Sequence, residues 1–267
     1  MIYSDLAIPG FTLARMYEEV SSTMDVARQC MSELRGGHGL VCARRQSAGR
    51  GRQGREWRSS DGALMFTLLL HAEVPVSHFS GYSLVVGVGL IEALRELGAH
   101  LQLKWPNDLV VVERGRIEKI GGVLIEVQEA GDRRIMLVGV GLNLSSAPQD
   151  LPVASSLKEK AGRDFNSEQV LPLVAAHLKT THERFVKSEG FLAFKDSWES
   201  CSCFEPGVTE LTIDLGGHRA KGIYQGLDPS GAVLLRDGVE NTTVPSGHVV
   251  SLLNLRERGG SKETWRA

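Results

Sequence analysis

The sequence lacks an apolar run long enough to cross a bilayer, and neither charge is in marked excess. Its 30 Lys and Arg oppose 32 Asp and Glu, a formal net charge of −2. Proteins that coat nucleic acid or lie on membranes need a broad basic face, so both classes are disfavoured. Any positive site must therefore be local. The first residues also lack the basic and then apolar segments of a secretion signal, so we expect a cytoplasmic protein with no membrane partner.

Cysteine is scarce as well, and the few cysteines do not form a recognisable site. Cys30, Cys42, Cys201 and Cys203 include no C-x-x-C pair and match no zinc or disulfide spacing. We therefore expect four buried, apolar, free cysteines.

The length of 267 residues allows one or two domains, and the hydrophobic pattern predicts what they are. Apolar residues at helical spacing predict a helix near 24–34, with Ser22 and Thr23 as candidate N-caps. A stretch that is apolar nearly all round at its start predicts a buried central helix at 83–97. Short apolar runs predict strands at 39–43 and 63–70, and four more between 101 and 144. This pattern predicts an α+β fold, with a mixed or antiparallel sheet and helices on one side.

The texture changes after Pro206, where apolar residues alternate with polar ones between Gly-rich turns. A period of two in several short runs predicts a small antiparallel β-barrel or sandwich. We place a domain boundary near Cys203, which divides the chain into a larger domain, residues 1–203, and a small C-terminal β-barrel domain, residues 204–267.

The most unusual segment, GRGRQGREW from Gly49 to Trp57, has three glycines and three arginines in nine positions. Glycine lets a backbone approach a ligand closely, arginine offers paired donors to phosphate or carboxylate, and Trp57 offers a flat face to a base. This composition is typical of a nucleotide site. The segment also matches G-x-G-x-x-G, but it joins two strands and opens no helix, so it does not predict a dinucleotide site.

Two other interpretations of this loop are open on composition alone. A basic loop between two strands is often simply solvated, and we weigh that about evenly with a binding role. Gly/Arg segments with an aromatic residue also bind single-stranded nucleic acid, although the rest of the chain is not basic.

Polar residues at the ends of apolar strands favour a binding role. The segment KWPND places Lys104, Asn107 and Asp108 at the end of an apolar strand, where Pro106 turns the chain. The pair Asn-Asp is also a good turn without any binding role. The segment KIGGVLIE opens a strand with a lysine and two glycines, as a close backbone approach to a ligand would require. In GVGLNL, Asn143 ends another apolar strand.

Together the segments SST, QSAGRGRQGREW, KWPNDL, KIGGVLIE and GVGLNL, between Ser21 and Leu144, resemble biotin protein ligases. The resemblance implies that residues 1–203 are a catalytic domain with biotin and ATP as substrates and Mg²⁺ as cofactor. The implied reaction forms biotinyl-5′-adenylate and pyrophosphate, and then transfers biotin to a lysine of a biotin carboxyl carrier protein of a biotin-dependent carboxylase. The family also implies a possible homodimer.

The resemblance also implies a role for individual residues. The catalytic group is Arg52, Lys119 and Asp108, with Asp108 also the candidate Mg²⁺ ligand. The biotin contacts are Ser22, Thr23, Gln46, Gly49, Arg50, Gly51, Arg52, Lys119, Gly121 and Gly122. The ATP contacts are Arg52, Arg55, Trp57, Lys104, Asn107 and Asn143.

The chain departs from the family pattern at two places. Met24 replaces the asparagine that usually follows the Ser-Thr pair, and a thioether cannot make the hydrogen bonds of an amide. The residues before Ser21 are too few for a helix-turn-helix domain, so we expect a form without the N-terminal DNA-binding domain and without a DNA partner.

Two other functions remain open. One is a lipoate or octanoate ligase of the same superfamily, although the arginine-rich and histidine-containing motifs of those enzymes are not evident. The other is a non-enzymatic module that binds a nucleotide or nucleic acid. For the enzyme, we expect the Gly/Arg loop to be mobile when empty and to become ordered on ligand.

Overall fold

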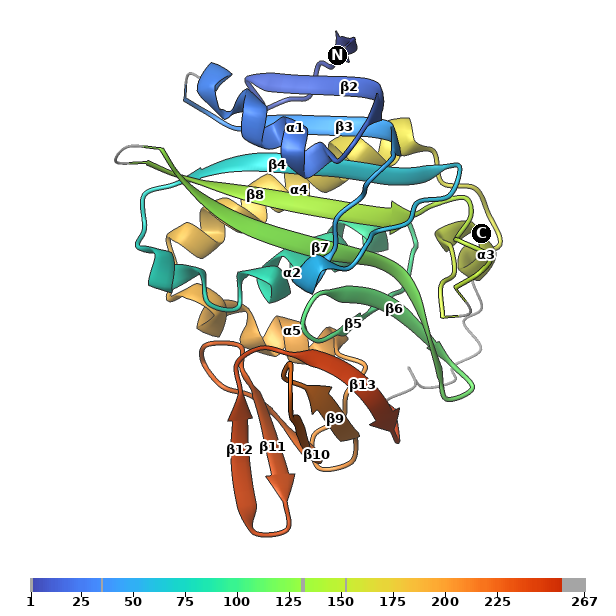
Figure 1. Ribbon diagram of the computed structural model, residues 1–267, viewed down its shortest axis with the longest axis vertical. Coiled ribbons are helices and arrows are strands. Elements are labelled where there is room, and N and C mark those ends of the chain that lie inside the picture. The colour runs from blue at the N-terminus through green and yellow to red at the C-terminus, as the bar shows by residue number, and fades with distance from the viewer. Residues whose placement is uncertain (1, 35, 131–132, 152, 256–267) are drawn as a thin grey trace.

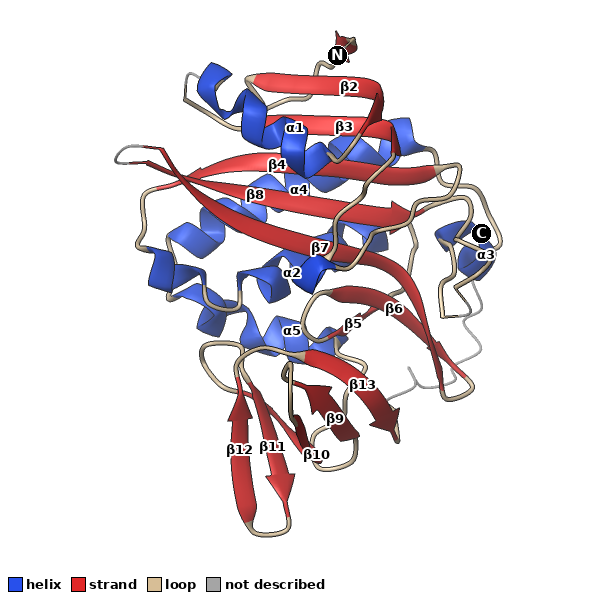
Figure 2. Ribbon diagram, in the orientation of Figure 1, coloured by secondary structure: helices blue, strands red, loops and turns tan. Residues whose placement is uncertain are grey.

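The computed structural model describes residues 2–34, 36–130, 133–151 and 153–255, which form two sheets with helices around the larger one (Figure 1 and Figure 2). The larger sheet has the strand order β1-β2-β3-β4-β8-β7-β6-β5. Its strands are β1 (Tyr3–Asp5), β2 (Leu13–Val20), β3 (Gly39–Gln46), β4 (Ala63–Ala72), β5 (Gln102–Lys104), β6 (Asp108–Glu113), β7 (Arg116–Ala130) and β8 (Arg133–Asn143). The predicted α+β class and mixed sheet are confirmed.

The sheet is mixed because one helix crosses between two of its strands. Strands β2 and β3 pair in parallel, and helix α1 (Thr23–Cys30) connects them. A parallel pair needs such a crossover, whereas the antiparallel neighbours β6 and β7 are joined by only two residues, Arg114 and Gly115. Ser22 accepts the Met24 N–H and caps α1, as its place before the apolar positions predicts.

The prediction that all helices lie on one side of the sheet is wrong for α1. In β3, Leu40 and Cys42 belong to the core beneath the other helices, whereas Val41 and Ala43 pack with α1 on the opposite face. Successive side chains of a strand point to opposite faces, and β3 is apolar on both. Because β3 is apolar on both faces, helices must pack on both sides of it. Helix α1 packs on the face that the other helices leave open.

The remaining helices are α2 (Tyr82–Glu96), α3 (Leu157–Ala161), α4 (Ser167–Val186) and α5 (Lys195–Cys201), with 3₁₀ turns at Met31–Glu33, Arg52–Gly54, Val76–Phe79 and Gly190–Phe194. Helices α2 and α4 cover the other face of the large sheet, behind it in Figure 1, while α5 lies between β5 and the second sheet. The prediction of a buried central helix is confirmed in α2. A Cβ at Gly89 would lie 2.7 Å from Thr181 Oγ1, so glycine allows α2 and α4 to approach closely.

The C-terminal residues form a second, antiparallel sheet, with the order β12-β11-β10-β9-β13. Its strands are β9 (Glu210–Asp214), β10 (Arg219–Leu227), β11 (Val233–Asp237), β12 (Glu240–Val244) and β13 (His248–Leu253). The predicted change to a period of two is confirmed, but closure into a β-barrel is not. Residues 256–267 of the predicted C-terminal domain lie outside the described residues.

The proposed boundary near Cys203 remains a prediction, and the chain there is bonded to the large sheet. The Cys203 N–H donates to the Leu103 carbonyl at 2.9 Å, next to a bridge between Leu103 and Ser202. Strand β5 therefore anchors the segment that leads into the second sheet.

The four cysteines are buried and free, as predicted. Burial raises the pKa of the Cys42 and Cys203 thiols to about 12, so both stay protonated and apolar. Among the described residues, no helix is both long enough and apolar enough to span a membrane.

A histidine lies buried between α4 and the sheet. His182 Nε2 donates to the His71 carbonyl at 2.8 Å, and its Nδ1 therefore accepts from Tyr82 O–H at 2.6 Å. Burial lowers the pKa of His182 from 6.5 to about 4. Below pH 6.5 the unfolded chain takes up a proton that the folded chain does not, so the free energy of unfolding falls as pH falls toward 4.

We predict that, because of His182, the free energy of unfolding is roughly 2 kcal/mol lower at pH 5 than at pH 7. Urea unfolding at several pH values measures this. His182→Gln, which keeps a donor and an acceptor, should lose that part of the pH dependence. His218→Gln is the control, because His218 is exposed in the turn between β9 and β10. Equal pH slopes for wild type and His182→Gln would contradict the prediction.

Candidate active site

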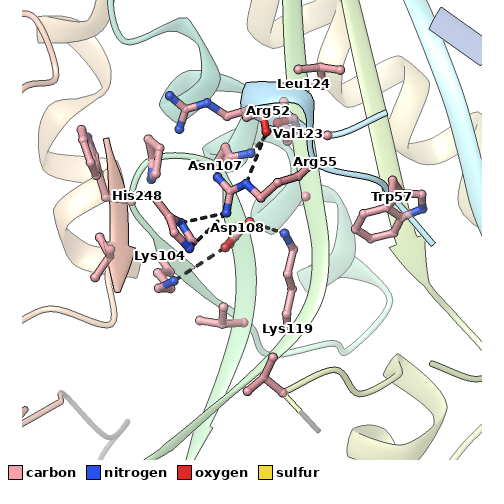
Figure 3. A pocket seen from close by; sticks show the side chains of 18 of the residues that line it. Arg52, Arg55, Trp57, Lys104, Asn107, Asp108, Lys119, Val123, Leu124 and His248 are labelled. Carbon is pink, nitrogen blue, oxygen red and sulfur yellow. Dashed lines mark hydrogen bonds and ion pairs between the residues drawn. The ribbon is translucent and has the colours of Figure 1, made fainter. Parts of the chain in front are cut away.

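A pocket of about 740 Å³ opens on the face of the large sheet that carries α1 (Figure 3). Its walls come from the start of α1, the loop after β3, the turn between β5 and β6, strands β7 and β8, and strand β13 of the second sheet. The predicted site segments, which are far apart in sequence, therefore meet at one cavity.

Most residues predicted for the site line this pocket. They are Ser22, Thr23, Gln46, Arg50, Gly51, Arg52, Arg55, Trp57, Lys104, Asn107, Asp108, Lys119 and Gly122. Their roles toward ligands remain predictions.

Three predicted residues, Gly49, Gly121 and Asn143, are not among the lining residues. A Cβ at Gly49 would lie 2.3 Å from the Trp57 carbonyl oxygen, and one at Gly121 would lie 2.7 Å from that of Gly141. Glycine at both positions is therefore explained by packing. Asn143 is buried and donates to the Ser155 carbonyl at 3.1 Å, while its Oδ1 has no partner among the described residues.

A bulge in β7 brings the catalytic candidates together. Strand β6 pairs Leu109 with Gly121 but Val110 with Lys119, so Ile120 is an extra residue. Without it, Lys119 and Gly122 would point to opposite faces, because they are three residues apart. Instead, a Cβ at Gly122 would lie 3.2 Å from Lys119 Nζ. The lysine crosses this glycine and reaches Asp108.

Asp108 is the carboxylate around which the cations of the pocket gather (Figure 3). Its Oδ1 lies 2.5 Å from Lys119 Nζ, and its Oδ2 lies 3.9 Å from Lys104 Nζ. Only 13% of the Lys104 side chain and 14% of the Asp108 side chain are exposed, and burial lowers the pKa of Lys104. Among the described lining residues the basic side chains are Arg50, Arg52, Arg55, Lys104 and Lys119, and the acidic ones are Glu56 and Asp108.

Arg52 has a buried donor that an anionic ligand could satisfy. Its Nη1 is buried and has no hydrogen-bond partner among the described residues. Burial, and then the neighbouring Arg55, lower the pKa of Arg52, while Asp108 opposes this. A buried donor without an acceptor is costly, so a carboxylate or phosphate at this point would relieve the cost.

Trp57 lies flat against β8. A Cβ at Gly141 would lie only 2.4 Å from Trp57 Cε2, so glycine is needed where the indole rests on the strand. Lys119 Nζ lies 5.6 Å from the centroid of the indole ring, within the range of a cation–π interaction. The indole Nε1 is buried without a partner among the described residues, as a donor awaiting a ligand would be.

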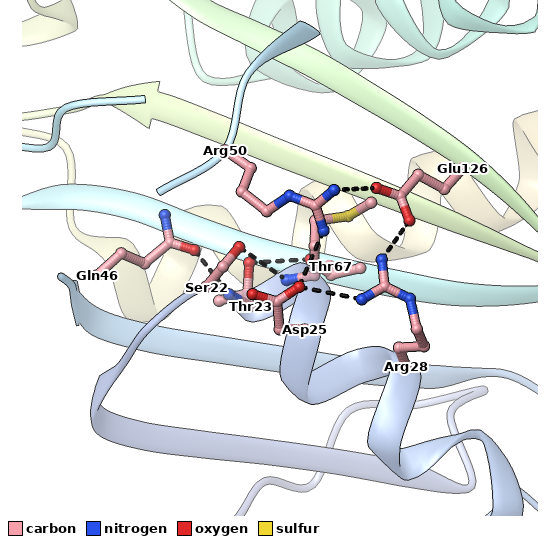
Figure 4. Close-up of polar contacts among 9 residues, drawn as sticks. Ser22, Thr23, Asp25, Arg28, Gln46, Arg50, Thr67 and Glu126 are labelled. Carbon is pink, nitrogen blue, oxygen red and sulfur yellow. Dashed lines mark hydrogen bonds and ion pairs between the residues drawn. The ribbon is translucent and has the colours of Figure 1, made fainter. Parts of the chain in front are cut away.

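The other end of the pocket is polar but mostly uncharged. The Thr23 N–H donates to Gln46 Oε1 at 2.7 Å, and Thr67 donates to Thr23 Oγ1 at 2.9 Å (Figure 4). Met24 lies beside them, and a Cβ at Gly139 would lie 2.7 Å from its sulfur. Met24 therefore fills space over β8 where the family usually has an amide.

The Gly/Arg loop is tied to the body of the protein through Arg50 (Figure 4). The loop is a tight hairpin, in which Trp57 N–H donates to the Gly49 carbonyl. Arg50 pairs with Asp25 at 2.9 Å and Glu126 at 3.0 Å, and Arg28 pairs with both carboxylates. The sequence interpretation missed this network, because it forms between α1, the loop and β7.

Strand β13 was also missed as part of the site. His248, Val249, Val250, Ser251, Leu252 and Leu255 line the pocket. Arg55 Nη1 lies 3.0 Å from both ring nitrogens of His248. A lone histidine in an alternating strand gives no sequence signal of a site, since its position depends on how the second sheet packs.

The fold and the pocket define a protein that binds an anionic ligand on a mixed sheet, beside a polar recess. A protein-family model described as the biotin/lipoate A/B protein ligase family matches residues 17–143. The bifunctional ligase/repressor BirA of Escherichia coli (strain K12) is 31% identical over 227 residues, which cover 82% of this chain and 68% of BirA. The chain belongs to the biotin/lipoate A/B protein ligase family.

Two further relatives cover most of their own length. The biotin–[acetyl-CoA-carboxylase] ligase of Paracoccus denitrificans is 30% identical over 225 residues, 80% of this chain and 90% of that protein. A solved structure of biotin protein ligase from Aquifex aeolicus, in complex with biotin and ATP, is similar at a TM-score of 0.74 and 29% identity. The similarity extends over 91% of this chain and 100% of the Aquifex chain.

We predict that Glu126→Gln loosens the Gly/Arg loop, because Arg50 then keeps only Asp25 as a carboxylate partner. Trypsin should cleave after the loop arginines severalfold faster than in wild type, as followed by mass spectrometry. The control is Glu129→Gln, in the same strand, where Glu129 is 69% exposed and lies 3.8 Å from its ion-pair partner, Arg134. Unchanged cleavage in Glu126→Gln would show that the network does not hold the loop.

Proposed function

We propose that this protein is a biotin–protein ligase that makes biotinyl-5′-adenylate from biotin and ATP and transfers biotin to a carrier lysine. The observation that carries the proposal is the division of one pocket into two ends. Ser22, Thr23 and Gln46 surround a polar, uncharged recess, while Arg52 and Lys119 lie at a cationic end. Biotin has the same division, a neutral ureido ring and a terminal carboxylate.

The cationic end fits the chemistry of the first step. A carboxylate oxygen of biotin attacks the α-phosphorus of ATP, the bond to the β-phosphate breaks, and pyrophosphate leaves. Two anions must meet, so preorganised cations that stabilise the developing charge supply most of the rate. Arg52, with its unpartnered Nη1, and Lys119, held by Asp108, bind the carboxylate and the α-phosphate. Trp57 supports the adenine, and Arg55 meets the departing phosphates.

In the second step, the amine of the carrier lysine attacks the biotinyl carbonyl and AMP leaves. The amine must be deprotonated to attack. Asp108 lies at the cationic end of the pocket, beside Lys119, and is the carboxylate that orients the amine. Transfer needs no phosphate beyond the α-phosphate. The two steps therefore make different demands on the pocket, although they share Lys119 and Asp108.

Mg²⁺ is part of the proposal, and the residues present allow it. A magnesium ion that binds with phosphates needs one or two protein carboxylates, and it would neutralise part of their charge. Asp108 is the candidate, although it already pairs with Lys119. The described residues contain no group of three or more His, Cys, Asp or Glu side chains that could hold a metal alone.

The carrier in this proposal is a biotin carboxyl carrier protein of a biotin-dependent carboxylase, as the Paracoccus relative's name suggests. The nearly balanced charge of the chain gives no support to a nucleic-acid partner. A homodimer and a cytoplasmic location remain predictions.

The nearest alternative is a lipoate or octanoate ligase, because the matched family model includes both activities. The Paracoccus relative and the Aquifex structure are both named as biotin ligases, which favours biotin.

We predict that purified protein with MgATP exchanges pyrophosphate into ATP when biotin is present, and not with lipoate, octanoate or no acid. Such exchange requires a reversible adenylate and identifies the acid in the same assay. Exchange with lipoate or octanoate alone would show that the protein is a lipoate or octanoate ligase of the same family. No exchange with any of them would leave a binding module.

We also predict that Lys119→Ala lowers the exchange rate roughly a hundredfold to a thousandfold, because a preorganised donor to the developing charge is lost. The melting temperature should change little, since Asp108 keeps Lys104 as a neighbour. Lys221→Ala is the control, an exposed lysine of the second sheet that pairs with Glu210. A large fall in melting temperature would make Lys119 a structural residue.

A further inference from the structure

Strand β13 is the part of the second sheet that reaches the pocket. It lies at the end of its sheet and pairs with β9, so its other side is turned toward the large sheet (Figure 1). A Cβ at Gly247 would lie 2.4 Å from Ile213 Cγ2, and glycine there lets the start of β13 close onto β9. This fixes where the next residue, His248, enters the pocket.

His248 lies among cations. Arg55 Nη1 is 3.0 Å from its Nδ1 and its Nε2, which makes this a contact between the Gly/Arg loop and the second sheet. Burial lowers the pKa of His248, and so do Arg55, Lys104 and Lys119, while Asp108 opposes them. The imidazole is therefore neutral at pH 7.

A neutral imidazole has one acceptor nitrogen and one N–H donor, whereas an arginine only donates. One ring nitrogen can accept from Arg55, and the other carries a proton for which no hydrogen-bond acceptor is recorded among the described residues. Close to His248 the pocket also holds Lys104, buried and 3.9 Å from a carboxylate that Lys119 already occupies. Donors thus exceed acceptors at this end.

A multiply charged anion between Arg55, Lys104 and His248 would correct this imbalance. The β- and γ-phosphates of ATP carry such a charge and offer many acceptor oxygens, and an anion would also raise the pKa of the imidazole and favour a charged donor. The α-phosphate and the carboxylate are bound instead by Arg52 of the Gly/Arg loop and Lys119 of β7.

We propose that His248 binds the β- and γ-phosphates of ATP together with Arg55, and binds the pyrophosphate that leaves. The inference rests on the proposed function and deepens it. It makes the second sheet a wall of the nucleotide site that acts in adenylation and not in transfer, because the adenylate retains only the α-phosphate.

The test compares His248→Ala and His248→Gln with the control His218→Ala. His218 is exposed in the turn between β9 and β10, outside the pocket. In biotin-dependent exchange, His248→Ala should raise the KM for ATP about tenfold or more, the effect of losing one hydrogen bond to a charged group. Inhibition by added pyrophosphate should weaken by a similar factor. The glutamine variant, which keeps an N–H donor, should recover part of both.

Single-turnover transfer from preformed biotinyl-adenylate to a carrier domain separates this role from a structural one. His248→Ala should transfer at the wild-type rate and keep the wild-type melting temperature. An unchanged KM for ATP, or equal losses in both steps with a lower melting temperature, would overturn the role of His248. If the wild-type protein itself shows no biotin-dependent exchange, the proposed function fails and this inference fails with it.

Discussion

The shared ion pair of Asp108 is the interaction on which the site depends. Two lysines and two arginines at one end of a pocket repel one another, and burial makes this repulsion more costly. Asp108 offsets part of it by lying between Lys104 and Lys119. The β7 bulge and Gly122 make this pair possible. The bulge turns Lys119 to the face of Asp108, and Gly122 leaves room for the lysine side chain to reach the carboxylate. The remaining positive charge of the pocket suits the two anions that meet in the proposed reaction, a carboxylate and a phosphate.

The protein separates the residues that hold the loop from those that meet the ligands. Arg50 is bound by Asp25 and Glu126, so one of the three arginines in the loop serves as an anchor. Arg52 keeps a buried Nη1 without a partner, and is therefore ready for an anion. This division explains how a Gly/Arg loop can lie in one defined place over the pocket and still present an unsatisfied cation. It also gives Glu126 and Asp25 a function, although neither is among the residues that line the pocket.

The second sheet is best understood as a part of the same site. Its edge strand β13 lines the pocket, and the contact between His248 and Arg55 joins it to the loop. The bonds of Leu103 to Ser202 and Cys203 fix the connecting segment on the large sheet. In the proposed reaction, β13 contacts only the outer phosphates, which are present in the first step and absent from the adenylate of the second.

The sequence by itself determined the chemistry and most of the elements. Apolar periodicity predicted α2 and the strands, Ser22 was predicted as a cap, and the motif glycines and arginines identified the segments that the structure brings to one pocket. Short-range rules suffice for these, because caps, turns and periods depend on neighbouring residues. Only the tertiary structure decided that α1 covers the opposite face of the sheet, that Glu126 holds Arg50, and that His248 faces Arg55. The Arg50–Glu126 contact joins residues 76 positions apart and the Arg55–His248 contact joins residues 193 positions apart, so both depend on how whole elements pack rather than on any local pattern.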